Sequence, residues 1–508
     1  MAAPGAVPNR ALITVSIMLA TIMQALDTTI ANVALPYMQG SLSAAYDQIT
    51  WVLTSYIVAA AIMTPVTGWI TGRLGLKRVF LVSVSGFTVA SMLCGGASSL
   101  GQMVIFRLLQ GIFSAALVPL SQSVLLDINP REKQGQAMAI WGAGIMVGPI
   151  LGPTLGGWLT FNYDWRWVFY INLPVGILAF LGILAFVRDT KRDRGQRFDF
   201  LGFGLLSLGV GALQIMLDRG EQNAWFGSLE TIIECALAVS GFWMFSVWTT
   251  IADRPFLNPA LLKDRNFVGS CVLIFVVGII LYATLALLPP MLQDLMDYPV
   301  TTAGLVMMPR GIGTMFAMLA VGRLIGRVDV RLLLLFGLAV TTLSLYQMTG
   351  YSLEMDWQPI VSAGLIQGVG LGFLFVPLST VAFATLDASY RAEGAGFFSL
   401  VRNIGGSIGI SMVETLQDRM TQTAHASLAQ QVTPFATPLH LPALQHLWNL
   451  HTTGGLAALN QEITRQAGMI AYIDNFEFMM VVTVLAIPLL LLLRRPRRPA
   501  DGAHMAME

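Results

Sequence analysis

The sequence predicts an all-α polytopic membrane protein with fourteen transmembrane helices, and three observations support this prediction. Hydrophobic residues make up 55% and charged residues only 11% of the 508 residues, too few charges to cover a soluble protein of this size. Apolar runs of roughly 20 residues, long enough to cross a bilayer, recur with short polar breaks. The basic residues are concentrated in alternate breaks, as expected for a chain that crosses a membrane repeatedly.

The apolar runs place the spans one by one. We expect them near residues 11–36, 49–70, 79–99, 102–125, 135–160, 168–187, 200–218, 231–251, 267–290, 302–325, 331–350, 357–384, 393–415 and 477–493. The first run continues to Pro36 without a small-residue cleavage site, so we interpret it as a retained span rather than a signal peptide.

The distribution of lysine and arginine gives an independent test of this topology. With the N-terminus inside, twenty-two of the 29 basic residues fall in inner segments and three lie within spans. The outer segments hold only four, namely Arg166, Arg219, Arg419 and Arg465. This bias follows the positive-inside rule and predicts that both termini are cytoplasmic. No nucleic-acid partner is expected.

A weak internal repeat indicates two related helical bundles. Gln110-Gly111 followed by Val118-Pro119-Leu120-Ser121 resembles Gln367-Gly368 followed by Val376-Pro377-Leu378-Ser379. We therefore expect six-helix bundles in residues 1–187 and 256–508, with an inserted helix pair in residues 188–255. Repeats of this kind place a substrate site between the bundles, near the membrane midplane. One long outer segment, residues 416–476, separates the last two spans, and its first part, Met412 to Gln430, is able to extend a span as a helix.

Two charged residues within spans are the main candidates for chemistry. Asp27 lies about sixteen residues from the inner end of the first span, where a carboxylate costs about 2.5–3.5 kcal/mol on insertion scales. It should therefore face protein or a water-filled cavity. Proton or substrate coupling is favoured over a purely structural role, because ionisable groups within membranes are usually functional. Arg107 enters the fourth span at a similar depth, so its charge can influence the protonation of Asp27.

Further polar residues within spans are candidates for a substrate cavity. Arg107, Gln110, Gly111, Ser114 and Ser121 share one helix face, and this stripe is expected to line the central cavity, with ordinary hydrogen bonding between helices as the alternative. Gln24 and Gln367 are assigned to the same cavity. Arg310 and Arg402 either contact anionic groups of a substrate or tie helices together, and the sequence favours neither role.

A glycine repeat in the fifth span predicts a packing and hinge element. Gly144, Gly148, Gly152 and Gly156 recur every four residues, with Gly157 following and with Pro149 and Pro153 between them. Small residues at this spacing let another helix approach closely, and prolines allow a helix to bend.

Several apparent motifs are set aside. Gly405-Gly406-Ser407-Ile408-Gly409 matches a hydrolase nucleophile pattern but lies in an apolar helix. His425, His440, His446 and His451 lack zinc-site spacing, and no Gly-Lys dipeptide forms a phosphate loop. No catalytic residue, metal site or cofactor is predicted.

The motifs resemble those of the fourteen-helix drug:proton antiporters of the major facilitator superfamily, and most closely the EmrB-type multidrug exporters. The run from Leu26 to Pro36 resembles a motif specific to this branch. Arg107 with Gln110-Gly111 resembles the fourth-helix motif of the superfamily, and Gly144 to Gly157 resembles its antiporter motif. The runs Trp165 to Pro174 and Leu213 to Gly220 are also typical, so the resemblance covers nearly the whole chain.

The resemblance implies a proton-coupled exporter of hydrophobic, drug-like compounds in the bacterial inner membrane, with Asp27 as the proton site and Arg107 as its modulator. It also implies two partners, a periplasmic adaptor of the EmrA type (a membrane fusion protein) and a TolC-type outer-membrane channel, with residues 416–476 as a contact surface for the adaptor. One alternative is a superfamily exporter of a metabolite or siderophore. A membrane-embedded enzyme or receptor is a more distant alternative, because no nucleophile–base or metal constellation is present.

The loop after the second span departs from the family pattern. Gly68, Arg73, Gly75, Lys77 and Arg78 fit the cytoplasmic loop motif of the superfamily, but Gly72 stands where an Asp is usual. That Asp normally helps to latch the inner gate. The latch of this chain must therefore use other groups or be looser.

Overall fold

The computed structural model describes residues 9–189, 198–252, 255–386, 390–432, 448 and 452–493. These residues are almost entirely helical, and their only β-type pairing is an isolated bridge between Ile325 and Val328. Twelve of their helices are long and apolar enough to cross a membrane, and a thirteenth span is formed by a bent pair. The remaining predicted span, residues 393–415, falls on the longer helix Arg391–Gln431, which is not among these candidate spans. The predicted all-α, two-bundle fold is confirmed.

The N-terminal bundle and the inserted pair comprise the first thirteen α-helices. Their bounds are α1 (Arg10–Ser41), α2 (Tyr46–Ile49), α3 (Trp51–Met63), α4 (Val66–Leu74), α5 (Leu76–Gly95), α6 (Leu100–Ser114), α7 (Leu117–Ile128), α8 (Arg131–Ile145), α9 (Val147–Asn162), α10 (Trp167–Tyr170), α11 (Asn172–Phe186), α12 (Phe200–Arg219) and α13 (Leu229–Ile251). The C-terminal bundle comprises α14 (Pro259–Lys263), α15 (Arg265–Pro290), α16 (Val300–Leu324), α17 (Val330–Met348), α18 (Trp357–Ala384), α19 (Arg391–Gln431) and α21 (Thr453–Leu485).

Prolines divide three of the N-terminal spans into two helices each. A proline ring clashes with the carbonyl group four residues earlier and removes one backbone donor. Accordingly, α8 ends at Ile145, four residues before Pro149, and α6 ends at Ser114, five residues before Pro119. The sharpest break, of 58°, separates α3 from α4 next to Pro65.

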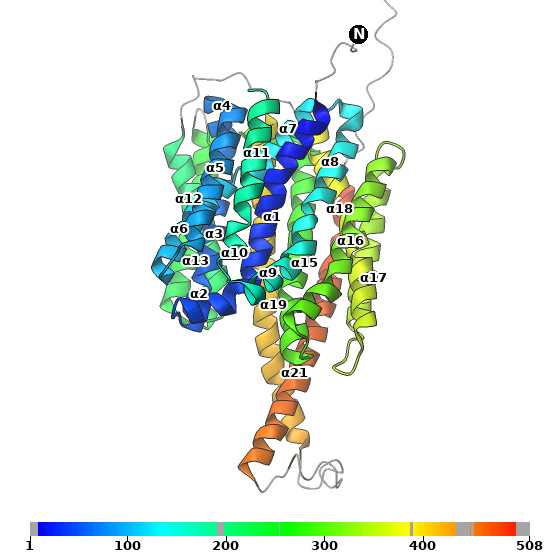
Figure 1. Ribbon diagram of the computed structural model, residues 1–508. Coiled ribbons are helices and arrows are strands. Elements are labelled where there is room, and N and C mark those ends of the chain that lie inside the picture. Colours follow the sequence, from blue (N-terminus) through cyan, green and yellow to red (C-terminus); the bar gives the residue numbers. More distant parts are fainter. Residues whose placement is uncertain are drawn as a thin grey trace, which may run out of the picture.

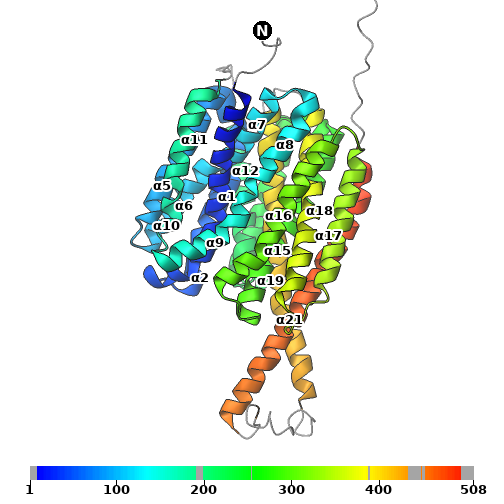
Figure 2. The ribbon, with the colours of Figure 1, turned by 45° about the vertical axis from the view of Figure 1, so that its right-hand side comes forward.

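The two ends of the molecule differ in shape (Figures 1 and 2). We call the end where α1 begins the amino-terminal face, and the opposite end, from which α19 and α21 project, the hairpin face. The 41 residues of α19 span about 60 Å, twice the thickness of a bilayer core. Gln417 connects the two projecting helices by donating to the Gly468 carbonyl at 3.1 Å, and His425 pairs with Asn460 at 3.0 Å.

The expected helical extension from Met412 to Gln430 is confirmed, since α19 runs unbroken to Gln431. The other projecting arm is not predicted by the sequence, because the last span was expected at 477–493 whereas α21 begins at Thr453. Pro434, Pro438 and Pro442 lie outside the described residues, as do His440, His446 and His451.

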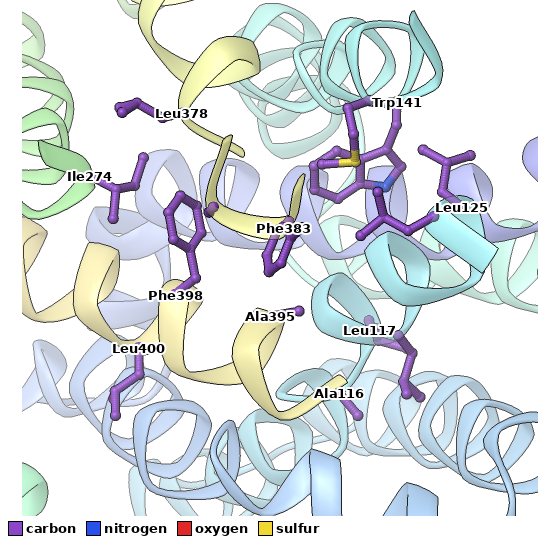
Figure 3. Packing of buried hydrophobic residues seen from close by; sticks show 14 of the residues in the cluster. Ala116, Leu117, Leu125, Trp141, Ile274, Leu378, Phe383, Ala395, Phe398 and Leu400 are labelled. Atoms are coloured by element: carbon purple, nitrogen blue, oxygen red, sulfur yellow. The ribbon is translucent and has the colours of Figure 1, made fainter. Parts of the chain in front are cut away.

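The bundles share a hydrophobic core toward the amino-terminal face. Figure 3 shows residues of α7 and α8 packed beside residues of α15, α18 and α19. Among them are Leu117, Leu125 and Trp141 of the N-terminal bundle and Phe383 and Phe398 of the C-terminal bundle. Toward the hairpin face each bundle has a separate core. Apolar burial therefore holds the bundles together mainly at the amino-terminal face.

One seam is packed along most of its length. A Cβ atom on Gly322 of α16 would lie 2.5 Å from Ala139 of α8, and one on Gly311 would lie 2.2 Å from Ile150 of α9. Such distances leave no room for a side chain, so α16 lies directly against the fifth span of the N-terminal bundle.

The inserted helix α12 connects the bundles at the opposite seam. Gln214 of α12 accepts a hydrogen bond of 2.7 Å from Ser407 of α19, while Asp218 of α12 accepts one from Thr54 of α3. Its partner α13 packs on α12, where Gly241 lies against the backbone of Gly209, and is otherwise largely exposed.

Candidate functional site

Asp27 lies inside the N-terminal bundle and is 2% exposed. Its carboxylate accepts three hydrogen bonds from two other helices. Arg107 Nη1 of α6 lies 2.7 Å from Oδ2, and Gln110 Nε2 of the same helix lies 2.8 Å from Oδ1. Asn172 Nδ2 of α11 also donates to Oδ1, at 2.8 Å. Helices α1, α6 and α11 therefore meet at this one carboxylate.

Arg107 is fully buried and has four further contacts. Its Nε donates to the Val52 carbonyl oxygen of α3 at 3.0 Å, and Nη1 also donates to Gln110 Oε1 at 2.8 Å. The guanidinium carbon lies 4.6 Å from the ring centre of Tyr56 and 5.5 Å from that of Phe169. A buried cation is stabilised both by its counter-ion and by aromatic faces.

A second layer of hydrogen bonds holds Asn172 in place. Asn172 Nδ2 donates to Ser91 Oγ of α5 at 2.9 Å, and Ser91 donates to the Phe169 carbonyl oxygen at 2.8 Å. The sequence does not single out Asn172 or Ser91, because an amide or a hydroxyl inside an apolar run barely changes hydropathy. The position of Asn172 within the family motif Trp165 to Pro174 is the one signal that could have identified it.

The arrangement links protonation to helix position. Three N–H donors point at two carboxylate oxygens, which suits an ionised carboxylate because that group only accepts hydrogen bonds. A proton on Asp27 would neutralise the charge that faces Arg107 and make the group a weaker acceptor, so all three contacts would weaken. Since the donors belong to α6 and α11, protonation of Asp27 acts directly on their contacts with α1.

The other predicted cavity residues lie in different places. Ser114 is buried and donates to the Gly111 carbonyl at 2.9 Å, and Gln24 is half-buried on α1. Arg402 is half-buried, lies over the Phe375 ring and contacts the Asn403 side chain at 3.4 Å. Gln110 forms a hydrogen bond between helices of its own bundle, which was the alternative to a role in lining the cavity. A role of these residues in the substrate cavity stays a prediction.

Arg310 and Gln367 are buried together in the C-terminal bundle, remote from Asp27 in the chain. Arg310 Nη2 donates to the Leu281 carbonyl oxygen at 3.3 Å, and Gln367 Nε2 donates to Thr284 Oγ1, also at 3.3 Å. Both acceptors belong to α15. Arg310 and Gln367 thus both contact α15, separately from the contacts around Asp27.

The glycine repeat packs against the helix that carries Asp27. A Cβ atom on Gly152 would lie 2.1 Å from Thr29 Oγ1, and one on Gly148 would lie 2.6 Å from the Ala25 side chain. Gly144 faces Met18, and Gly156 faces Ile30. Gly157 is also buried, Pro149 follows the break between α8 and α9, and Pro153 lies inside α9. The close approach places α8 and α9 directly against α1.

The loop motif lies at the amino-terminal face. Gly75 has a φ of 92°, and a Cβ atom there would meet the Asp189 carboxylate at 2.3 Å. Lys77 Nζ donates to the Leu184 carbonyl oxygen at 2.6 Å, and Arg73 lies over the Trp69 ring. Arg78 is exposed. These contacts fix the turn between α4 and α5 to the end of α11.

Two contacts join the bundles beside this loop, where Gly72 replaces the usual Asp. Arg391 Nη1 of α19 lies 3.2 Å from Asp127 Oδ1 of α7. A Cβ atom on Gly68 would lie 2.9 Å from the backbone of Glu393. The Glu393 side chain accepts a hydrogen bond of 2.6 Å from the Asn258 backbone N–H through Oε1. The Asp127–Arg391 ion pair is not predicted by the sequence, since charges at the inner ends of spans are common.

The described residues contain no group of three or more His, Cys, Asp or Glu side chains arranged to hold a metal ion. Gly405 and Gly409 lie within α19 and pack against α15.

The sequence profile of the Major Facilitator Superfamily matches residues 17–410, and the chain belongs to this superfamily. It is a multi-pass membrane transporter rather than an enzyme. It is 36% identical over 496 residues to the fatty acid resistance protein FarB of Neisseria gonorrhoeae, an alignment that covers 97% of each chain. It is 37% identical over 471 residues to the multidrug export protein EmrB of Escherichia coli K12, with 92% of this chain and 91% of EmrB covered. The predicted resemblance to EmrB-type exporters is confirmed.

Solved structures support the fold. The human organic anion transporter MFSD10 superposes with a TM-score of 0.60 at 15% identity, over 94% of this chain and all of that one. A bacterial homologue of the lysosomal transporter Spinster, in an inward-facing conformation, superposes with a TM-score of 0.56 at 17% identity, covering 96% and 99%.

Proposed function

We propose that this transporter is a proton-coupled antiporter that exports hydrophobic, drug-like compounds. The observation that carries the proposal is the buried contact of Asp27 with Arg107, Gln110 and Asn172, in which one proton alters the contacts of three helices. The names of its relatives, a multidrug export protein and a fatty acid resistance protein, favour amphipathic compounds as substrates.

The amino-terminal face is assigned to the cytoplasm, because twenty-two of the 29 basic residues fall in the segments that the sequence predicts to be inner. The membrane is then the bacterial inner membrane, with both termini cytoplasmic. In the described conformation the bundles are joined at this face by the shared core and by Asp127–Arg391. A cavity open to the cytoplasm requires both contacts to separate.

In the proposed cycle, a proton from the outside binds Asp27, removes the charge that faces Arg107 and loosens the contacts of α1 with its three donors. The freed α1 then moves against α6 and α11, and the glycine contacts with α8 and α9 transmit this movement toward the inner seal. Each proton that enters supplies about 2.3 kcal/mol per 100 mV of membrane potential. Substrate and proton need not bind together, since competition for one conformation is sufficient.

Reconstituted vesicles with an imposed pH gradient test this function. We expect export of a hydrophobic cation such as ethidium to follow the gradient in the wild type and to lose this dependence in Asp27→Asn. Uptake that ignores the gradient, or coupling by Asp27→Asn equal to that of the wild type, contradicts the proposal. Transport confined to a metabolite or siderophore favours the alternative exporter.

We also propose that the projecting arms of α19 and α21 contact a periplasmic adaptor of the EmrA type, which in turn meets a TolC-type outer-membrane channel. Beyond the predicted span, α19 continues for about 25 Å, and this reach supports a contact with a soluble partner. Removing residues 424–460, which shortens both arms together, should prevent co-purification of the adaptor while leaving transport in vesicles intact. Recovery of the complete complex with the shortened chain contradicts this partner assignment.

A further inference from the structure

The polar network around Asp27 has a partial counterpart in the C-terminal bundle. Gln367 of α18 occupies the place of Gln110 in the internal repeat. Gln110 Nε2 donates to Asp27 of the first span, and Gln367 Nε2 donates to Thr284 Oγ1 of α15, the first long helix of the second bundle. Thr284 therefore stands where Asp27 stands, and it carries no charge.

Gly111 follows Gln110 and Gly368 follows Gln367, and the contacts of these glycines identify the matching residues on the neighbouring helix of each bundle. A Cβ atom on Gly111 would lie 2.4 Å from the Tyr56 carbonyl oxygen, in the second span. A Cβ atom on Gly368 would lie 2.0 Å from the Arg310 carbonyl oxygen of α16, the second long helix of its own bundle. Arg310 thus matches Tyr56 in position. The N-terminal bundle pairs a cation with a carboxylate at this level, whereas Arg310 of the C-terminal bundle contacts no carboxylate of the described residues.

Arg310 is buried without a counter-ion. Its exposed fraction is 6%, Nη2 reaches only the Leu281 carbonyl oxygen, and Nη1 has no hydrogen-bond partner among the described residues. The same part of the chain supplies no carboxylate within ion-pair distance of Arg310. Gln367, fully buried, likewise has an Oε1 atom without a partner there. Buried cations are normally paired, so this one indicates a missing anion.

The two side chains reach the same place. Their contacts on α15, Leu281 and Thr284, are three residues apart and so share one helix face. Arg310 and Gln367 each lie ten residues from the hairpin-face end of their helices, which corresponds to a depth of about 15 Å. The same three helices also contribute apolar residues to one buried cluster, among them Ile280, Ala283, Val306, Ile360 and Ala363.

We propose that Arg310, assisted by Gln367, binds the carboxylate of an amphipathic substrate while the substrate's apolar part contacts these side chains. A carboxylate accepts from Nη1, and the Gln367 amide can turn to offer its donor. The inference rests on the proposed export function and adds a substrate class to it. The pair is closed off in the described conformation, so the substrate reaches it when α15, α16 and α18 rearrange during transport.

The test uses two probes with the same apolar body, pyrenebutyrate and its trimethylammonium analogue, bound to the full chain in lipid nanodiscs and followed by pyrene fluorescence. We expect Arg310→Gln to weaken pyrenebutyrate binding at least tenfold and to change binding of the cationic analogue less than twofold. Arg310→Lys, which keeps the charge but not the planar fork, should lie between the two.

Thr284→Asp supplies a second, independent variant. This variant places a carboxylate opposite Gln367, just as Asp27 lies opposite Gln110. The new carboxylate should compete with the substrate and also weaken pyrenebutyrate binding at least tenfold. The melting temperature of the variant should be no lower than that of Arg310→Gln. The proposal is overturned if the wild type does not bind pyrenebutyrate, or if either variant binds it within twofold of the wild type. Transport of the cationic analogue by the wild type along a pH gradient tests the export function separately.

Discussion

Replacing Asp27 with Asn tests the buried network most sharply. The change removes the charge that faces Arg107 Nη1 at 2.7 Å and replaces one acceptor oxygen with an NH2 donor. If the remaining oxygen faces Arg107, the new NH2 group faces the donors of Gln110 and Asn172. If the remaining oxygen faces Gln110 and Asn172, the NH2 group faces the donor of Arg107. In either orientation at least one hydrogen bond is lost and the buried guanidinium has no counter-ion.

Breaking a buried ion pair from one side costs about 3–5 kcal/mol, whereas removing both charges costs much less. We therefore expect Asp27→Asn to destabilise the purified protein by about 3–5 kcal/mol. The double variant with Arg107→Gln should be at least about 2 kcal/mol more stable than additivity predicts. Denaturant unfolding in detergent measures both quantities. Asp164→Asn, at an exposed ion pair with Arg166, is the matched control and should change stability by less than about 1 kcal/mol.

A loss below about 1 kcal/mol for Asp27→Asn, or strict additivity in the double variant, would refute this reasoning. The first result would mean that water or a rearranged donor replaces the carboxylate at little cost. The second would mean that Asp27 and Arg107 do not stabilise each other.

Three further predictions concern the contacts around this network. Asp127→Asn or Arg391→Gln should each favour separation of the two bundles at the amino-terminal face by about 1 kcal/mol, measured as longer spin-label distances between α8 and α16. The charge exchange Asp127→Arg with Arg391→Asp should restore the closed distances. Gly152→Ala should cost about 1–3 kcal/mol because its Cβ meets Thr29 at 2.1 Å, and Gly156→Ala, with 3.3 Å of clearance, should cost less in the same unfolding assay. Gly75→Ala should lower stability by about 1–2 kcal/mol because the φ of Gly75 is 92°. Gly101→Ala should not lower stability, since a Cβ atom on Gly101 would have no neighbouring atom within 4 Å, and equal losses at both glycines would contradict the backbone argument.

Features with a hydropathy or charge signal could be predicted from the sequence. Each long apolar run lies on one helix or on two consecutive helices, and the depth of Asp27 and Arg107 in their spans was sufficient to place them near each other. The glycine repeat indicated close helix packing, although its partner, α1, could not be named from spacing alone.

Features that depend on tertiary contacts could not be predicted. Asn172 completes the carboxylate site, yet an amide in an apolar run gives little signal. Asp127 and Arg391 are far apart in the sequence and lie at span ends, where charges are ordinary. The first half of α21 is polar, and its helical form depends on contacts with α19, such as the Gln417 hydrogen bond to Gly468. Hydropathy identifies membrane spans but does not report such pairing.

Proton release on substrate binding tests the central claim most directly. Ethidium is added to the purified transporter in a weakly buffered solution containing a pH indicator dye, and wild type and Asp27→Asn are compared at equal substrate occupancy. We expect substrate binding to shift the wild type away from the conformation in which Asp27 holds a proton and so to release protons, and we expect Asp27→Asn to bind substrate without release. Equal proton release from both proteins would contradict the assignment of Asp27 as the transported proton's site.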